Sequence, residues 1–151
     1  MFREPRVDQY GIRCAVGIDE VPVKFEIVFE GRISLADPLP DDRICGVWTM
    51  TLEDLTATKL MANADRWADD STMSRDLIDL AMLVEGGNVP VAGVEKARGA
   101  YGTSIDSSFA KARERLLDRP GRLHQCMARM GMVLAEDELR SRIQMLCLTP
   151  S

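Results

Sequence analysis

The chain has 151 residues, of which 46% are hydrophobic and 28% charged, and its formal net charge at pH 7 is −5. This length and composition are typical of one globular domain, so we expect residues 1–151 to form a single domain. Binding to duplex DNA depends on neutralising its phosphates, so the acidic balance argues against duplex DNA as a partner.

The positions of the cysteines and the hydropathy of the chain predict where in the cell the protein is found. The four cysteines show no C-x-x-C pair and the chain has one histidine, so we expect no structural zinc site. Scattered thiols are typical of a reducing environment, which predicts a cytoplasmic protein. No run of about 20 apolar residues is present, so we expect no membrane-spanning segment. The N-terminus lacks the apolar core of a secretory signal.

The N-terminal part of the chain predicts two strands. Residues 10–16 form the first, residues 17–20 the turn, and residues 21–29 the second. In the second strand apolar residues alternate with more polar ones, which predicts one face in the core. The other face displays Lys24 and Glu26.

A loop and a short strand follow. Residues 36–43 contain two prolines and three acidic residues, a composition that does not fit a central strand. Residues 44–50 predict a short strand that leads into the first helix.

Residues 50–85 predict two helices with a short polar connection. Thr51 is a good N-cap, and Asp54 stands three residues later, at the position of a capping-box acid. The second helix begins at Ser71 or Ser74 and ends before Gly86, because glycine commonly ends a helix. Apolar stripes are expected on both helices at Leu52, Leu55, Leu60 and Met61, and at Leu77, Leu80, Ala81 and Val84.

Charged groups of opposite sign emerge from this helix pair. Lys59, Asn63 and Arg66 share one side of the first helix. Asp76 and Asp79, three residues apart, project together from the second. Two interpretations follow. In one, Lys59 or Arg66 pairs with Asp76 or Asp79 in a structural salt bridge. In the other, a lysine for phosphate and a carboxylate for metal binding or base catalysis form a site.

The C-terminal part predicts helices only. Glycine, proline and serine residues mark the ends of four helices, which are expected at residues 90–100, 104–117, 122–132 and 135–148. Strands at about residues 10–50 and helices at about 51–148 predict an α+β fold: a small, mostly antiparallel or mixed sheet in the N-terminal third, followed by a helical part. Basic residues concentrate between Lys111 and Arg129, which indicates either a solvated helix face or an RNA-contacting surface.

The charged helix pair also carries a family resemblance. The segment Leu55-Thr-Ala-Thr-Lys59-Leu-Met-Ala62, then Arg66, then Arg75-Asp76-Leu-Ile-Asp79-Leu80 resembles the third motif of the AbiEii/AbiGii-type nucleotidyltransferases. In that family a lysine-bearing helix is followed by an arginine and an R/K-D-x-x-D-L helix. The resemblance implies a toxin component that transfers a nucleotide from an NTP to an RNA or protein acceptor, with Mg²⁺ as cofactor. It also implies an antitoxin or a second protein chain as partner.

The resemblance assigns roles to individual residues. Lys59 would contact the phosphates or base of the nucleotide, with Arg66 and Asn63 in support. Asp76 would act as general base or hold a metal, and Asp79 would orient the helix pair. These enzymes take a third carboxylate from a late strand of the sheet, and Glu26 is the candidate for that catalytic, metal-binding position.

The chain departs from the family pattern ahead of Glu26. The family places a Gly-Ser turn and an Asp-x-Asp pair there, and neither is present, so the resemblance covers the C-terminal portion of such an enzyme. Three explanations compete: a shortened, inactive relative, a site completed by another polypeptide, or a longer protein whose start is misplaced. The alternative function is a non-catalytic interaction module with a structural helix pair. An exposed sheet edge would also favour homo-oligomers.

Overall fold

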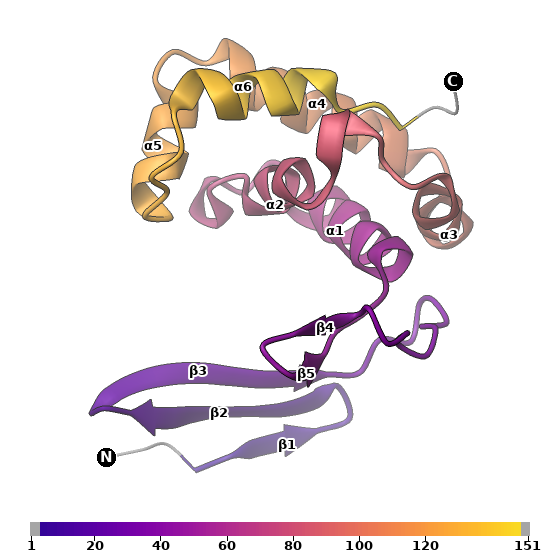
Figure 1. Ribbon diagram of the computed structural model, residues 1–151, viewed down its shortest axis with the longest axis vertical. Coiled ribbons are helices and arrows are strands. Elements are labelled where there is room, and N and C mark those ends of the chain that lie inside the picture. The colour runs from indigo at the N-terminus through magenta and orange to yellow at the C-terminus, as the bar shows by residue number, and fades with distance from the viewer. Residues whose placement is uncertain (1–3, 149–151) are drawn as a thin grey trace. The chain divides into compact units, whose positions relative to one another are not determined.

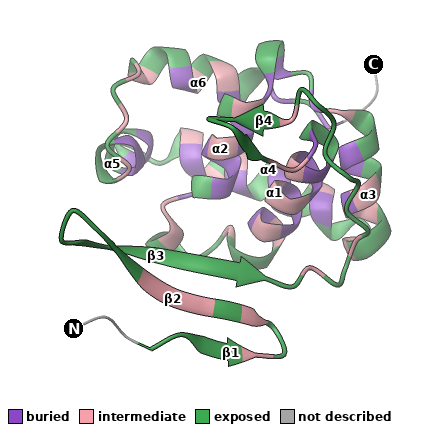
Figure 2. Cartoon of the chain, turned by 60° about the horizontal axis from the view of Figure 1, so that its bottom comes forward, coloured by how far each residue is buried: buried purple, intermediate pink, exposed green. Residues whose placement is uncertain are grey.

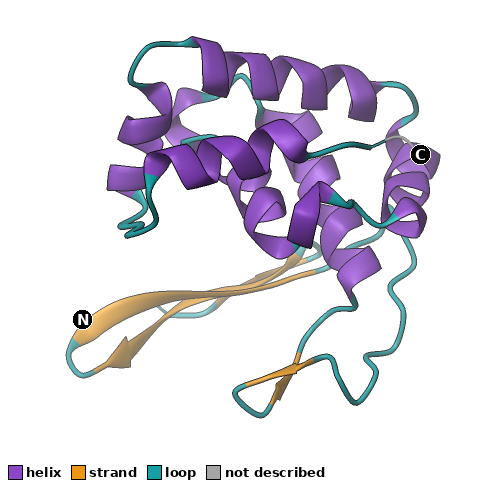
Figure 3. Cartoon of the chain, turned by 45° about the horizontal axis from the view of Figure 1, so that its top comes forward, coloured by secondary structure: helices purple, strands orange, loops and turns teal. Residues whose placement is uncertain are grey.

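The computed structural model describes residues 4–148 (Figure 1). Its backbone contacts divide the chain into two compact units, Met1–Ser34 and Leu35–Ser151. Strands precede six α-helices in the described residues, which confirms the α+β prediction. The expectation of a single domain over residues 1–151 stays a prediction. Figure 3 shows the long strands in the first unit and the helices in the second.

The first unit is a three-stranded antiparallel sheet in the order β1-β2-β3. The strands are β1 (Arg6–Asp8), β2 (Gly11–Ile18) and β3 (Val21–Val28). The two predicted strands are confirmed, but the turn is shorter than predicted, because Gly17 and Ile18 still pair with β3. Asp19 and Glu20 alone form it, with φ of 47° and 65°, the handedness that suits a tight hairpin.

The prediction that one face of β3 lies in the core is wrong. All eight residues of the strand are exposed, Phe25 with 48% and Ile27 with 53% of their surface accessible. The alternation itself is real, since Phe25 lies opposite Cys14 and Ile27 opposite Ile12. Residues 4–34 contain strands and turns only, so this unit has no second layer to cover the face (Figure 2).

The second unit begins with a small hairpin and continues as helices. The predicted single strand at residues 44–50 is instead two short strands, because Cys45 and Gly46 have positive φ and turn the chain. The elements are β4 (Arg43–Ile44), β5 (Val47–Trp48), α1 (Leu52–Arg66), α2 (Arg75–Leu83), α3 (Val91–Tyr101), α4 (Ser104–Asp118), α5 (Arg122–Arg129) and α6 (Glu136–Met145), with 3₁₀ turns at Asp70–Thr72 and Glu85–Gly87.

Helix α1 packs against α2, α3 and α4 in the helical unit. The predicted N-cap is confirmed, since Thr51 Oγ1 accepts a hydrogen bond from the Asp54 N–H at 3.2 Å. The predicted apolar stripe is only partly right: Leu60 and Met61 are buried, but Leu52 is exposed. The buried side of α1 turns toward α3, where Gly93 allows the two backbones to approach closely.

Helix α2 begins at Arg75, one residue after the later of the two predicted starts. Ser74 precedes it in a left-handed conformation, and Asp70–Thr72 forms a separate 3₁₀ turn capped by Asp69. The predicted stripe of α2 is buried, and the four later helices lie within a few residues of their predicted ranges. None of the helices in the described residues is long and apolar enough to cross a membrane.

Candidate functional site

The charged side chains predicted on α1 and α2 meet across the helix pair. Lys59, in the middle of α1, places its Nζ 2.5 Å from Asp79 Oδ2 and 4.0 Å from Asp76 Oδ1. The two aspartates are three residues apart, so one face of α2 presents both carboxylates to one ammonium. The Lys59 side chain keeps 30% of its surface exposed, which leaves it open to a ligand.

Arg66 and Asp76 form the second pair of this cluster. Arg66 donates from Nε to Asp76 Oδ2 at 2.6 Å and from Nη2 to Asp76 Oδ1 at 2.8 Å. Asp76 is 3% exposed, whereas the Arg66 side chain is 46% exposed. The hydrogen bonds with Asp76 raise the pKa of the Arg66 guanidinium. A two-pronged pair of this kind fixes both side chains in one geometry.

Asn63 lies between the two basic residues on α1 and is only 5% exposed. Its amide nitrogen has no hydrogen-bond partner among residues 4–148. Leaving a buried donor unsatisfied costs about 1–3 kcal/mol. This nitrogen is also inaccessible from the surface, so a role for Asn63 in nucleotide binding stays a prediction.

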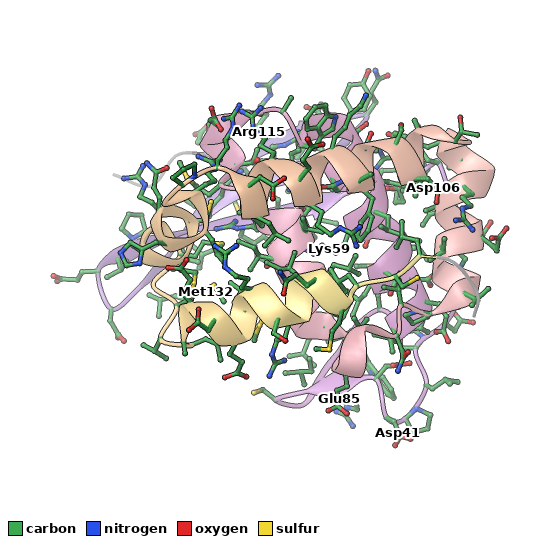
Figure 4. All side chains as sticks on the ribbon, turned by 90° about the horizontal axis from the view of Figure 1, so that it is seen from above. Asp41, Lys59, Glu85, Asp106, Arg115 and Met132 are labelled. Carbon is green, nitrogen blue, oxygen red and sulfur yellow. The ribbon has the colours of Figure 1, made fainter. Side chains whose placement is uncertain are left out.

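A cavity of about 450 Å³ adjoins the Lys59–Asp79 pair. Lys59 and Met132, both labelled in Figure 4, line it. Its other lining residues are Arg75, Ile78, Asp79, Met82 and Met130. The cluster therefore has space beside it for a small polar group. Met130 and Met132 come from the segment directly after α5, which no local pattern joins to α1.

Comparison with known proteins gives a family match over residues 3–145, to the family described as "Nucleotidyl transferase AbiEii toxin, Type IV TA system". The chain belongs to the AbiEii nucleotidyltransferase toxin family. No curated protein and no solved structure matches it. At the level of the family it is a nucleotidyltransferase-like toxin, and a type IV toxin–antitoxin system implies an antitoxin as partner.

Glu26, the remaining predicted site residue, lies in β3 of the first unit. It forms ion pairs with Lys24 at 2.8 Å and with Arg13 at 3.2 Å. The hydrogen bond from Lys24, with the charge of Arg13, lowers the pKa of the Glu26 carboxyl. All three residues line a cavity of about 440 Å³ within this unit. Glu26 is thus an ionised carboxylate with two cationic neighbours.

Nucleotidyltransferases of this family generally use an NTP and Mg²⁺. Mg²⁺ prefers carboxylate oxygens and water in octahedral geometry. In the described part of the chain no group of three or more His, Cys, Asp or Glu side chains could hold a metal ion. The carboxylates of Asp76 and Asp79 are already bound to Arg66 and Lys59. These residues do not by themselves fit a Mg²⁺ site.

The sequence pattern did not reveal one half-buried ion pair of the AbiEii chain. The Asp54 carboxylate, expected only as a capping acid, is fully buried, pairs with Lys96 of α3 and accepts the Ala36 N–H at 2.7 Å. Burial raises the pKa of Asp54, but Lys96 and the backbone N–H outweigh it and hold the pKa below its usual value. This pair ties α3 and the preceding loop to the start of α1.

Proposed function

We propose that this AbiEii-family chain transfers a nucleotide from an NTP to an RNA or protein acceptor, using the charged cluster on α1 and α2. The observation that carries this proposal is the position of Lys59, held between two carboxylates at 2.5 and 4.0 Å and facing a cavity. Triphosphate oxygens would compete with Asp79 for its ammonium, because a lysine binds phosphate as a compact charge.

The proposed roles combine the family resemblance with the contacts of the side chains. Lys59 binds the phosphates of the nucleotide, and Arg66 and Asn63 complete the nucleotide site. Asp76 takes the proton of the acceptor hydroxyl, a role that requires Arg66 to release one carboxylate oxygen so that the hydroxyl can come within hydrogen-bond reach. Asp79 orients Lys59, since the two are 2.5 Å apart.

We propose further that the chain is incomplete or inactive alone. The carboxylates of the helix pair are engaged by cations, which leaves too few ligands for the Mg²⁺ that such transfer uses. Glu26 remains the metal-ligand candidate within the first unit, where it would have to give up its ion pairs with Lys24 and Arg13. The other ligands would come from a second polypeptide. The AbiEii family match supports a partner chain of some kind, the antitoxin.

A second candidate function is a non-catalytic interaction module. The bidentate Arg66–Asp76 pair favours this function. The Asp76 side chain is 96% buried, so its charge must be compensated by the Arg66 guanidinium. Removing one member of such a pair leaves an uncompensated charge, whatever the protein does. In this reading the helix pair is a rigid scaffold that presents other surfaces to a partner.

The test is a thermal melt with Mg²⁺ and each of the four NTPs, on wild type, Lys59→Ala and the control Lys111→Ala. Lys111 is an exposed lysine of α4 that lies over Trp67, outside the cluster. A ligand at 100 times its Kd adds about 2.7 kcal/mol, which corresponds to a shift of about 5–11 °C for a domain of this size. We expect a shift that Lys59→Ala abolishes and Lys111→Ala retains. Absence of a shift with every NTP would reject the nucleotide site and favour the interaction module.

A further inference from the structure

A second cavity, of about 420 Å³, lies where the end of α1, the start of α2 and the end of α5 meet. Its lining is mainly polar, and three of its residues are arginines. We call it the arginine pocket. It is lined by Arg66, Ser71, Thr72, Met73, Arg75, Arg129 and Met130.

The charges of the arginine pocket do not balance. Arg66 is bound by Asp76, but the side chains of Arg75 and Arg129 have no ion pair or hydrogen bond with any residue in the described range 4–148. The other lining side chains are two hydroxyls and two methionines, which carry no charge. Two cationic guanidinium groups therefore face one cavity without a carboxylate of their own. Arginine binds phosphate and carboxylate groups through paired, planar hydrogen bonds.

The backbone at the wall of the pocket adds to the positive potential. Helix α2 starts at Arg75, and the preceding Ser74 makes no side-chain capping hydrogen bond in the described structure. The N-terminal end of a helix carries a partial positive charge and free N–H groups. Asp76 stands in this first turn, but Arg66 already binds both of its oxygens.

We propose that the arginine pocket is a phosphate-binding subsite, with Arg75 and Arg129 as the residues that bind the phosphate oxygens. Arg75 and Met130 also line the cavity beside Lys59, so the two cavities are neighbours. A phosphate in the arginine pocket would therefore lie next to the proposed nucleotide site. That the bound phosphate serves nucleotide transfer rests on the proposed function. The phosphate would come either from the NTP or from the backbone of a nucleic-acid acceptor.

The experiment measures binding of inorganic tripolyphosphate by calorimetry at low ionic strength. It compares wild type, Arg129→Gln, Lys59→Ala and a matched control, Arg142→Gln. Arg142 is an arginine of α6 that, among the residues the structure describes, pairs only with Glu138 on the surface and lines neither cavity. Arg66 is left intact because its removal would leave the buried Asp76 carboxylate without its partner. The Arg75→Gln/Arg129→Gln double variant removes both unpaired guanidinium groups.

We expect Arg129→Gln to weaken tripolyphosphate binding about 10- to 100-fold, the size of one charge-assisted interaction, and Arg142→Gln to leave it unchanged. The double variant should abolish binding. Equal affinity in wild type, Arg129→Gln and the double variant would overturn the inference. Circular dichroism on each variant shows that its helices are intact, so lost binding reports on the pocket.

Failure of this inference is distinguishable from failure of the proposed function. Lys59-dependent NTP binding that Arg75 and Arg129 do not affect would keep the function and reject the subsite. Tripolyphosphate binding that needs Arg129, in a protein that binds no NTP, would keep the subsite and reject the function. Repeating the series with NTPs and with a short single-stranded RNA separates the two phosphate sources, because only the true source loses affinity in Arg129→Gln.

Discussion

Arg66 and Asp76 join the last turn of α1 to the first turn of α2 through two hydrogen bonds of 2.6 and 2.8 Å. The carboxylate is buried and the guanidinium is half exposed, so one end of the pair is fixed and the other faces the arginine pocket. The pair can therefore hold the helices together and still present an arginine edge to a ligand. Stability and ligand binding must be measured separately to tell these roles apart.

The Arg66–Asp76 pair should show strong coupling in a double-mutant cycle. We expect Arg66→Ala to lower the free energy of unfolding by about 2 kcal/mol, because it leaves Asp76 buried and unpaired. The coupling energy with Asp76→Ala should be about 1–3 kcal/mol in urea unfolding. The exposed Arg142–Glu138 pair of α6 is the control, with coupling below about 0.5 kcal/mol. Equal coupling energies in the two pairs would contradict the conclusion that the Arg66–Asp76 pair holds α1 and α2 together.

The Lys59–Asp79 pair should behave differently, because both side chains are about one-third exposed. We expect Asp79→Asn to cost less than about 1 kcal/mol of stability. If Asp79 orients Lys59 for a nucleotide, the same change should weaken the NTP-induced thermal shift. Unfolding and nucleotide titrations on one preparation check both. A large loss of stability with an unchanged NTP shift would favour the structural reading of this pair.

The Asp54–Lys96 pair makes stability depend on pH. The folded state holds the pKa of Asp54 below its usual value of about 3.9. The stabilisation is therefore complete above that pH and is lost as pH falls through the folded-state pKa. We expect Lys96→Met to destabilise the protein by about 2–4 kcal/mol and to move acid unfolding to higher pH, since burial then raises the Asp54 pKa. Denaturant unfolding between about pH 2 and 7, a range that covers both an ordinary aspartate pKa of about 3.9 and a lowered one, checks this.

Two glycines of α3 provide a matched test of how α1 and α3 pack. A Cβ on Gly93 would lie 2.6 Å from the Glu53 carbonyl oxygen and 2.7 Å from Thr56 Cβ, whereas a Cβ on Gly99 would meet no described atom within 4 Å. We expect Gly93→Ala to destabilise by about 1–3 kcal/mol, and Gly99→Ala to stabilise by about 0.5–1 kcal/mol. Similar thermal shifts for the two variants would show that the helices are not in close contact at Gly93.

The apolar face of the first unit should promote self-association, the homo-oligomer expected from an exposed sheet. Val23 and Phe25 of β3 are 41% and 48% exposed. An exposed apolar sheet with free edges favours contacts between chains. We expect the apparent mass in sedimentation to rise with concentration, and Phe25→Lys to reduce that rise. A monomer at every concentration would count against this prediction.

The sequence by itself determined the local elements and the family. Alternating apolar residues marked β3, and the Thr51 cap and glycine punctuation marked the helices, because these signals depend on neighbours within a few residues. The order of Lys59, Arg66, Asp76 and Asp79 carried the resemblance that the family match over residues 3–145 confirms. The sequence alone did not determine which of these four charged residues pair with one another.

Only the tertiary structure decided which charges meet and which faces are covered. It pairs Lys59 with Asp79 and Arg66 with Asp76, and it brings Arg129 from α5 to the start of α2. It also buries the Asp54 carboxylate against Lys96 and leaves β3 exposed. The physical reason is that ion pairs, cavities and burial depend on how separate elements cross. The crossing is set by packing between residues far apart in the chain, such as the close approach at Gly93.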